Sequence, residues 1–438
     1  MHKKFFIFLL CLLGISMARA QTNFSSLEEL WHYADSHNIQ LKTAEAEKIK
    51  AGTNVKQAYG GLLPTVTANG SYTDNMKIQS TLIPSEIFNP AAAPGTFTEV
   101  TFGRRFIYNG NIVAQLDLLN TEDWFSVKLA KLNNELAALN ISQARQDLYK
   151  QLANAWFSSL LLAEAENISR ENVRVCTSIH EVAKNKFNEG TISEITVNTA
   201  LINKEKAERN LNVAVQNKLV QINNLRSLLN IKDSISLPVS NTEKNAAIAD
   251  GTFTSDPSVQ LAYTQMQLAK SKWQSSKAAF FPTLSAYYQY NTQIAADNFM
   301  KFSNSNTLPQ QYWGLRLSMP VFAGNARRFQ MQNAKVDYAL RQEQYESSRL
   351  QAGISDQNLL ITYNSSLGAY QKSKNILSLY RRNDEHAQKR LQEGMISLDE
   401  RLRSYSDLIT SQNEYLQSMS DYFIQQYSLK IRQTNLIP

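Results

Sequence analysis

Residue types that perform catalysis or hold metals are scarce in this sequence. Histidine occurs 5 times and cysteine 2 times in 438 residues, and these residues form no recognisable metal-binding motif. There is no Gly-rich phosphate loop and no nucleophile elbow between a strand and a helix. We therefore expect a protein that is not an enzyme and that holds neither a metal nor a cofactor.

The one cysteine beyond the first twenty residues is Cys176. A single cysteine cannot form an internal disulfide, so the chain must be stabilised by other means. A lone cysteine within a helical pattern is most often a small, buried apolar residue, and this is the role that we expect for Cys176.

The first twenty residues have the pattern of an export signal. Lys3 and Lys4 give a basic start, Phe5 to Ile15 form a short apolar run, and Ala18-Arg19-Ala20 has the small-x-small cleavage pattern. The sequence therefore predicts a signal peptide over residues 1–20, with Gln21 as the first mature residue.

Export limits the partners of the remaining chain. The formal net charge is +7, and removal of Lys3, Lys4 and Arg19 leaves +4. This small excess and the export argue against a nucleic-acid partner. No later stretch approaches the roughly 20 apolar residues of a spanning helix. The mature chain is thus expected to be soluble or to enter a membrane as strands.

An internal repeat organises the mature chain. Asn38-Ile39-Gln40-Leu41 and Asp256-Pro257-Ser258-Val259 are each followed by a proline, Pro64 and Pro282, at the same distance from the first residue of the segment. The residues around these prolines also correspond. Shared spacing without gaps indicates two copies of one structural unit.

A second correspondence follows in the same order. Phe187 to Ser193 and Leu391 to Ser397 both contain the sequence Gly-x-Ile-Ser. The sequence therefore predicts two repeats, residues 21–230 and 254–438, joined by a polar connector over 231–253.

Each repeat begins with a helix and two strands. In the first repeat, a helix is expected from about Ser26 to Gly61, because Gly60, Gly61 and Pro64 end it. Residues 65–73 then alternate between an apolar and a hydroxyl-rich face. This alternation is typical of a transmembrane barrel strand, although a half-buried strand of a soluble sheet shows it too.

The remaining strands are weaker in the sequence. Pro84, Pro90 and Pro94 predict a long surface loop, and a return strand is expected to end near Leu116-Asp117-Leu118. The second repeat has the corresponding segments: an outgoing strand at 284–290, a loop at 297–309 and a return strand at 315–321.

Long helices are the strongest prediction. No proline or glycine occurs between Glu122 and Asn188, and leucines step through this segment by three and four residues. The counterpart in the second repeat runs from Asn325 to Gln392. Each ends at its Gly-x-Ile-Ser turn, and a returning helix follows at 193–229 and 397–433.

These elements suggest how the chain could enter a membrane. Strands span lipid only as closed barrels, and the smallest barrels have about eight strands. Each chain offers four candidate strands, so several copies must share one barrel. The predicted fold class is mainly α, with long antiparallel coiled-coil helices and four strands per chain contributing to the shared barrel.

The order of elements resembles the TolC-like outer-membrane efflux protein family. Met319 to Arg327 is similar to the family's Pro-hydrophobic-Phe-x-Gly-x-x-Arg signature between strand and helix, and Leu62-Leu63-Pro64, Phe280-Phe281-Pro282, Gly190 and Gly394 match further positions. The resemblance implies a homotrimer with a twelve-stranded barrel in outer-membrane lipid and a helical tunnel in the periplasm. It also implies a periplasmic adaptor protein and an inner-membrane pump as partners.

The resemblance also indicates where function would lie. In the family, acidic residues six and nine positions after the second glycine line the periplasmic aperture. Here Glu400 and Arg403 hold these positions, beside Asp399, and Thr196 and Thr199 hold them in the first repeat. Arg403 departs from the acidic pattern. An ordinary solvated helix face would explain these charges equally well.

The two turns are the expected adaptor-docking sites. They comprise Glu189, Gly190 and Thr191 in the first repeat and Glu393, Gly394 and Met395 in the second. Each glycine could also serve only as a left-handed helix end, and both roles are compatible.

Two other functions remain open from the sequence. The same fold could be the outer-membrane channel of a type I protein secretion system. A different class, an exported soluble coiled-coil scaffold or adhesin, would explain the helices but not four amphipathic strands at corresponding places. The main expectation is a passive exit duct that carries small molecules outward.

Overall fold

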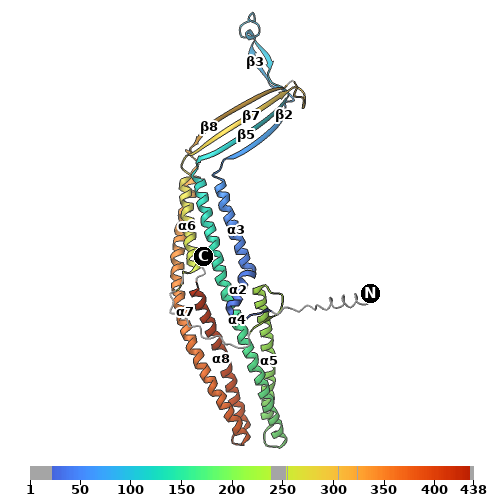
Figure 1. Cartoon of the computed structure of the whole chain (residues 1–438), viewed down its shortest axis with the longest axis vertical. Coiled ribbons are helices and arrows are strands. Elements are labelled where there is room, and N and C mark those ends of the chain that lie inside the picture. The colour runs from blue at the N-terminus through green and yellow to red at the C-terminus, as the bar shows by residue number, and fades with distance from the viewer. Residues whose placement is uncertain (1–21, 238–252, 254, 304, 323, 435–438) are drawn as a thin grey trace, which may run out of the picture. The chain divides into compact units, whose positions relative to one another are not determined.

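The computed structural model describes residues 22–237, 253, 255–303, 305–322 and 324–434 (Figure 1). The chain forms two compact units, and each draws on both halves of the sequence. The strand unit contains Ile49–Glu135 and Thr264–Gln342, and the core unit contains the rest. The expected signal peptide and most of the expected connector lie outside the described residues.

The strand unit carries a four-stranded antiparallel sheet with the strand order β2-β5-β7-β8. These strands are β2 (Thr65–Asp74), β5 (Phe106–Leu119), β7 (Thr283–Ala296) and β8 (Asn306–Ser318). All four predicted strands are present, but their bounds differ: β7 continues to Ala296, and β8 begins at Asn306 and ends at Ser318, before the predicted end at 321. The loop between them shortens to residues 297–305. One continuous sheet therefore joins strands from both halves of the chain (Figure 1).

The predicted long loop between β2 and β5 is instead a folded hairpin. β3 (Ser80–Pro84) pairs with β4 (Phe97–Thr101), and the short 3-10 helix η1 (Ser85–Ile87) follows β3. The prolines that suggested a loop do not prevent the pairing. Pro84 is the last residue of β3, and Pro90 and Pro94 lie in the turn, where a missing N–H interrupts no ladder.

The long helices have almost the predicted bounds. They are α4 (Thr121–Asn188) and α7 (Ala326–Gln392), each within one residue of the predicted start. The returning helices α5 (Glu194–Leu229) and α8 (Leu398–Gln433) are also confirmed. α6 (Pro257–Ala278) precedes β7. None of the helices in the described parts of the chain is long and apolar enough to cross a membrane.

The single helix expected over residues 26–61 is wrong: two helices meet at Asn38. These are α2 (Leu27–His37) and α3 (Ile39–Gly60). The Asn38 side chain accepts hydrogen bonds from the backbone N–H groups of Gln40 (2.8 Å) and Leu41 (3.2 Å), and it donates to the carbonyl of Leu228 (2.8 Å). A local side-chain cap thus competes successfully with continuation of the helix.

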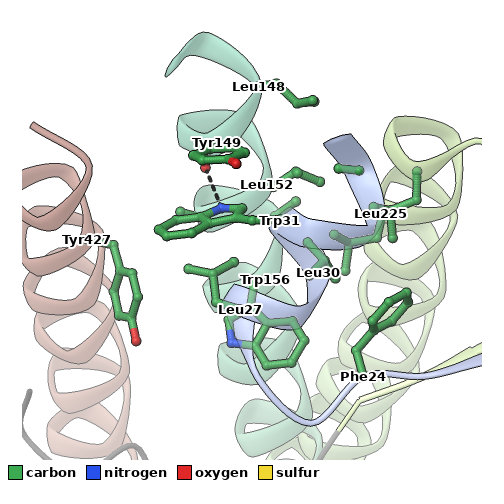
Figure 2. Packing of buried hydrophobic residues seen from close by; sticks show 14 of the residues in the cluster. Phe24, Leu27, Leu30, Trp31, Leu148, Tyr149, Leu152, Trp156, Leu225 and Tyr427 are labelled. Carbon is green, nitrogen blue, oxygen red and sulfur yellow. Dashed lines mark hydrogen bonds between the residues drawn. The ribbon is translucent and has the colours of Figure 1, made fainter. Parts of the chain in front are cut away.

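α2 packs into the main apolar cluster of the core unit (Figure 2). Trp31 stacks on Tyr149 of α4 with ring centroids 4.7 Å apart, and its indole N–H donates to the Tyr149 carbonyl at 3.3 Å. Leu27 and Leu30 are fully buried beside Leu152. A two-residue parallel pairing of β1 (Thr22–Asn23) with β6 (Ile235–Ser236) lies next to this cluster, since Phe24 belongs to it.

A second apolar cluster lies among α4, α5, α7 and α8, in the parts of these helices that lead to the turns. It contains Cys176 of α4, alanines of α5 and Leu402 of α8. Cys176 is 3 % exposed, which confirms its predicted burial. Burial raises the pKa of its thiol to about 11, so little thiolate, the reactive form, exists at neutral pH.

Candidate functional site

The two predicted docking turns have the same backbone construction. Gly190 and Gly394 have φ angles of 73° and 74°, in the left-handed region that favours glycine. The N–H of Gly190 donates to the Phe187 carbonyl (2.9 Å), and the N–H of Thr191 donates to the Lys186 carbonyl (2.9 Å). These two bonds satisfy carbonyls that the helix end would otherwise leave unpaired.

The second turn reproduces these bonds. Gly394 donates to the carbonyl of Leu391 (3.2 Å) and Met395 to that of Arg390 (2.8 Å). A serine then begins the returning helix in each case: Ser193 caps the N–H of Thr196, and Ser397 caps that of Glu400. Two tight turns of equal geometry thus expose the residues between the helices.

All six predicted docking residues are exposed at these turns: Glu189, Gly190, Thr191, Glu393, Gly394 and Met395. A Cβ atom added at either glycine would meet no heavy atom within 4 Å. The glycines are therefore required by backbone conformation and not by crowding.

The predicted aperture residues do not all have the same environment. Asp399, Glu400, Arg403 and Thr199 are exposed, whereas Thr196 is 7 % exposed. Within the described residues, no ion pair joins Arg403 to Glu400. The three charged side chains therefore project from the first turns of α8 into solvent.

The buried charge near this turn is one that the sequence analysis missed. Arg401 is 2 % exposed and pairs with Asp384 of α7 through two hydrogen bonds, one of them 3.2 Å long. A bidentate pair of this kind fixes the orientation of both side chains. The signal was present in the sequence, because Arg401 lies on the same helical stripe as Leu398, Leu402 and Tyr405.

Arg401 belongs to a polar chain that connects α8 with α4. Its guanidinium carbon lies 5.3 Å from the centre of the Tyr405 ring. The Tyr405 hydroxyl donates to Asn172 Oδ1 (2.7 Å), and Asn172 Nδ2 donates to Gln412 Oε1 (3.1 Å). Burial raises the pKa of the Tyr405 hydroxyl, which keeps it protonated as a donor. Three helices, α4, α7 and α8, are thereby held together near the turns.

The sheet of the strand unit has one polar face. Asn69, Asn111, Asn291 and Gln310 lie opposite one another across all four strands. Asn69 donates to Asn111 at 3.0 Å, and the next row is similar, since Tyr312 donates to Gln289 at 2.8 Å. Residues directly opposite in antiparallel strands share a face, so these amides lie together on a largely polar face, on which Val113 is an apolar exception.

The opposite face of the sheet is mostly apolar. Val66, Ala114, Tyr288 and Trp313 form one row across the four strands, and Leu116, Ala286 and Leu315 form another. Val66 is 68 % exposed and Trp313 is 77 % exposed. In water, so much exposed apolar surface on a sheet would be unfavourable, whereas lipid would cover it.

A sheet with one polar and one apolar face, combined with long paired helices, is the architecture of an outer-membrane channel subunit. The sequence matches the model of the outer membrane efflux protein family over residues 30–230 and 252–431, and the chain belongs to this family. This confirms the resemblance that the sequence motifs indicated. The family consists of transport proteins, in agreement with a protein that is not an enzyme.

Solved structures share this fold. The CmeC outer membrane channel of Campylobacter jejuni has a TM-score of 0.72 at 16% identity, over 94% of this chain and 85% of that one. The MtrE outer membrane channel of Neisseria gonorrhoeae gives 0.73 at 17%, over 93% and 88%. The outer membrane protein VceC of Vibrio cholerae gives 0.71 at 17%, over 92% and 93%. No curated protein sequence matches the chain.

Proposed function

We propose that this chain is the outer-membrane exit duct of a tripartite efflux system. In this role, it forms a passive channel that carries small molecules from an inner-membrane pump and a periplasmic adaptor to the exterior. The channel itself catalyses no reaction. The pump supplies the energy for transport. Membership of the outer membrane efflux protein family and the two faces of the sheet support this proposal.

The observation that best supports the proposal is that the four-stranded sheet, within the described residues, is open at both edges. β2 and β8 each pair with a single neighbour, and the apolar face between them is exposed. Unpaired backbone groups at a sheet edge are too costly in lipid, so the edges must be closed. A homotrimer in which β2 of one copy pairs with β8 of the next gives a barrel of twelve strands, with the amide face lining the water-filled interior.

The exposed turns fit a role at the periplasmic end of such a duct. We assign Glu189, Gly190, Thr191, Glu393, Gly394 and Met395 to adaptor docking. Asp399, Glu400, Arg403 and Thr199, which are exposed, are assigned to the aperture, whereas Thr196 is buried within its own chain and does not line the opening. Exposure and shared geometry of the turns support the first assignment. Three copies of Glu400 would favour cations and water, whereas Arg403 would weaken that preference.

The two repeats, 21–230 and 254–438, fit this assembly as copies of one unit. The order of the main elements supports this view: α3-β2-β5-α4-α5 is followed by α6-β7-β8-α7-α8. Two copies of one unit per chain would give each trimer six similar units around one axis, which is suited to a tube.

Disulfide crosslinking tests the shared barrel. A panel of cysteine pairs, one residue in β2 and one in β8, is introduced into a Cys176→Ser background and oxidised in intact cells. We expect linked dimers and trimers on denaturing gels. Matched pairs in β5 and β8 provide the control, because β7 lies between those strands. Monomers alone from every β2–β8 pair, with the protein present in the membrane fraction, would contradict the proposal.

Deletion of the gene tests efflux. Cells lacking the protein should accumulate more of at least one compound in a panel of dyes, detergents and antibiotics, and expression from a plasmid should restore the original level. Unchanged accumulation of every compound would argue against small-molecule efflux.

A further inference from the structure

A pocket of about 690 Å³ lies where the helices of the strand unit meet the sheet. α4 contributes Trp124, Phe125 and Lys128, and the end of α6 and the residues beyond it contribute Gln274, Lys277 and Phe281. The aromatic side chains give the pocket an apolar floor. Trp124 is 52 % exposed and Phe281 is 59 % exposed, so this floor is open to the surroundings.

The two lysines supply the pocket with positive charge. Lys277 Nζ lies 3.7 Å from the centre of the Trp273 ring, and Lys128 Nζ donates to Gln274 Oε1 at 3.3 Å. In the described part of the chain, neither lysine has a carboxylate partner. Both ammonium groups are therefore oriented by neutral neighbours and keep donors for an additional anion.

No carboxylate is among the described residues that line the pocket. Trp124, Phe125 and Lys128 share one face, at spacings of three and four residues. Glu122 is directed into a different groove, which α4 forms with α6 and α7. The charges of Lys128 and Lys277 are thus not offset within the pocket.

The pocket lies next to one end of the sheet. β5 ends at Leu119, just before α4 begins, and β7 begins at Thr283, just after Phe281. β5 and β7 are the two central strands. The pocket is therefore connected to the middle of the sheet and not to β2 or β8, the edges where copies would join.

We propose that this pocket binds the headgroup phosphate of an anionic glycerophospholipid, such as phosphatidylglycerol, in the inner leaflet of the outer membrane. Lys128 and Lys277 contact the phosphate, and Trp124, Phe125 and Phe281 contact the glycerol and upper acyl chains. Aromatic side chains favour the membrane–water interface, and basic side chains attract anionic lipid headgroups. The inference rests on the proposed placement of the sheet in the membrane.

Native mass spectrometry of the purified full-length protein tests the site. The protein is titrated with phosphatidylglycerol or with phosphatidylcholine of the same acyl chains. We expect tighter binding of phosphatidylglycerol to the wild type and at least about tenfold weaker binding to the Lys128→Gln/Lys277→Gln variant. The control variant, Lys272→Gln/Lys335→Gln, loses the same charge elsewhere in the strand unit and should bind as the wild type does.

Equal binding of the two lipids by the wild type, or equal loss in both double variants, would overturn the lipid site. Circular dichroism and the oligomeric state of each variant are measured in parallel, and Trp124→Ala provides a second variant without a change of charge that should also weaken binding. Membrane fractionation and dye efflux of the wild type separate the two proposals. Absent lipid preference with intact efflux overturns this site alone, whereas release from the membrane overturns the duct itself.

Discussion

Two helices of nearly equal length, α4 and α7, differ sharply in burial. α4 has 68 residues and α7 has 67. Leu148, Leu152 and Trp156 of α4 are at most 1 % exposed. Of the described residues of α7, only Ser366 and Leu377 are buried. α4 therefore packs against other helices of its own chain, whereas most of the surface of α7 is exposed.

The open surface of α7 is not uniformly polar. Six large apolar residues recur along it at intervals of four, seven or ten residues, and all are exposed: Phe329, Val336, Leu340, Leu350, Ile354 and Ile361. These intervals put them on one side of a helix. We call this set the α7 stripe. A stripe of this kind needs a partner helix, and another copy of the chain can provide one.

We infer from this difference that α4 and α7 stabilise the protein in different ways. α4 contributes to the stability of the monomer, through its contacts with α2, α5 and α8. We expect the α7 stripe to contribute mainly through contacts with another copy in the proposed trimer. The following experiments separate these two contributions.

The largest loss of stability is expected for a substitution in α4. Trp156→Ala removes a side chain that is 1 % exposed, and the lost burial and the cavity should cost about 3–5 kcal/mol of unfolding free energy. Denaturant unfolding of the purified protein in detergent measures the loss. Val182→Ala, at an exposed position of the same helix, should cost less than about 1 kcal/mol. Similar costs for both variants would contradict the assigned role of α4.

A charge in the α7 stripe should affect assembly and leave the helices folded. Ile354→Asp places a carboxylate in the expected apolar contact and should raise the protein concentration needed to form the proposed trimer by at least about tenfold. Light scattering after size-exclusion chromatography measures the mass. Ser355→Asp introduces the same charge next to the stripe and should leave the trimer intact. A stable Ile354→Asp trimer would show that the stripe is not an interface.

Replacing Gly394 and Gly353 with alanine should change the stability of the protein in opposite directions. Gly394→Ala forces a Cβ atom into the left-handed region and should cost about 1 kcal/mol. Gly353 is inside α7, where an added Cβ meets nothing within 4 Å, so Gly353→Ala should stabilise the helix by up to about 1 kcal/mol. Thermal unfolding of both variants measures the two signs. A stabilising Gly394→Ala would refute the left-handed requirement.

The smallest effect concerns an ion pair that joins α4 to α5. Hydrogen bonds from Lys218 (2.8 Å) and Arg170 (2.5 Å) hold the pKa of Glu166 below its usual value of 4.5. The lowered pKa means that the folded state favours the carboxylate. The stabilisation is thus fully present above pH 4.5 and is lost as the pH falls through the lower folded-state pKa.

Glu166→Gln should therefore reduce stability at pH 7 by less than about 1 kcal/mol and flatten the decrease in stability below pH 4.5. Thermal unfolding between pH 3 and pH 7, at one fixed ionic strength, measures both quantities. An unchanged acid limb in the variant would mean that Glu166 does not contribute to it.

Local sequence signals located most elements. An uninterrupted segment without proline or glycine predicted α4, and the repeated Gly-x-Ile-Ser predicted both turns. These features depend on backbone preferences that act within a few residues, so they can be read without knowledge of distant contacts. The exposed residues of the turns could be predicted for the same reason.

The positions of the long helices and the turns, and the two different faces of the strands, could be predicted from the sequence alone. The sequence did not show that the Asn38 side chain bonds to Leu228, that β5 joins β7 in one sheet, or that Arg401 is buried against Asp384. Each of these depends on a partner far away in the sequence or on another helix. Local periodicity carries no information about which such partner a side chain will meet.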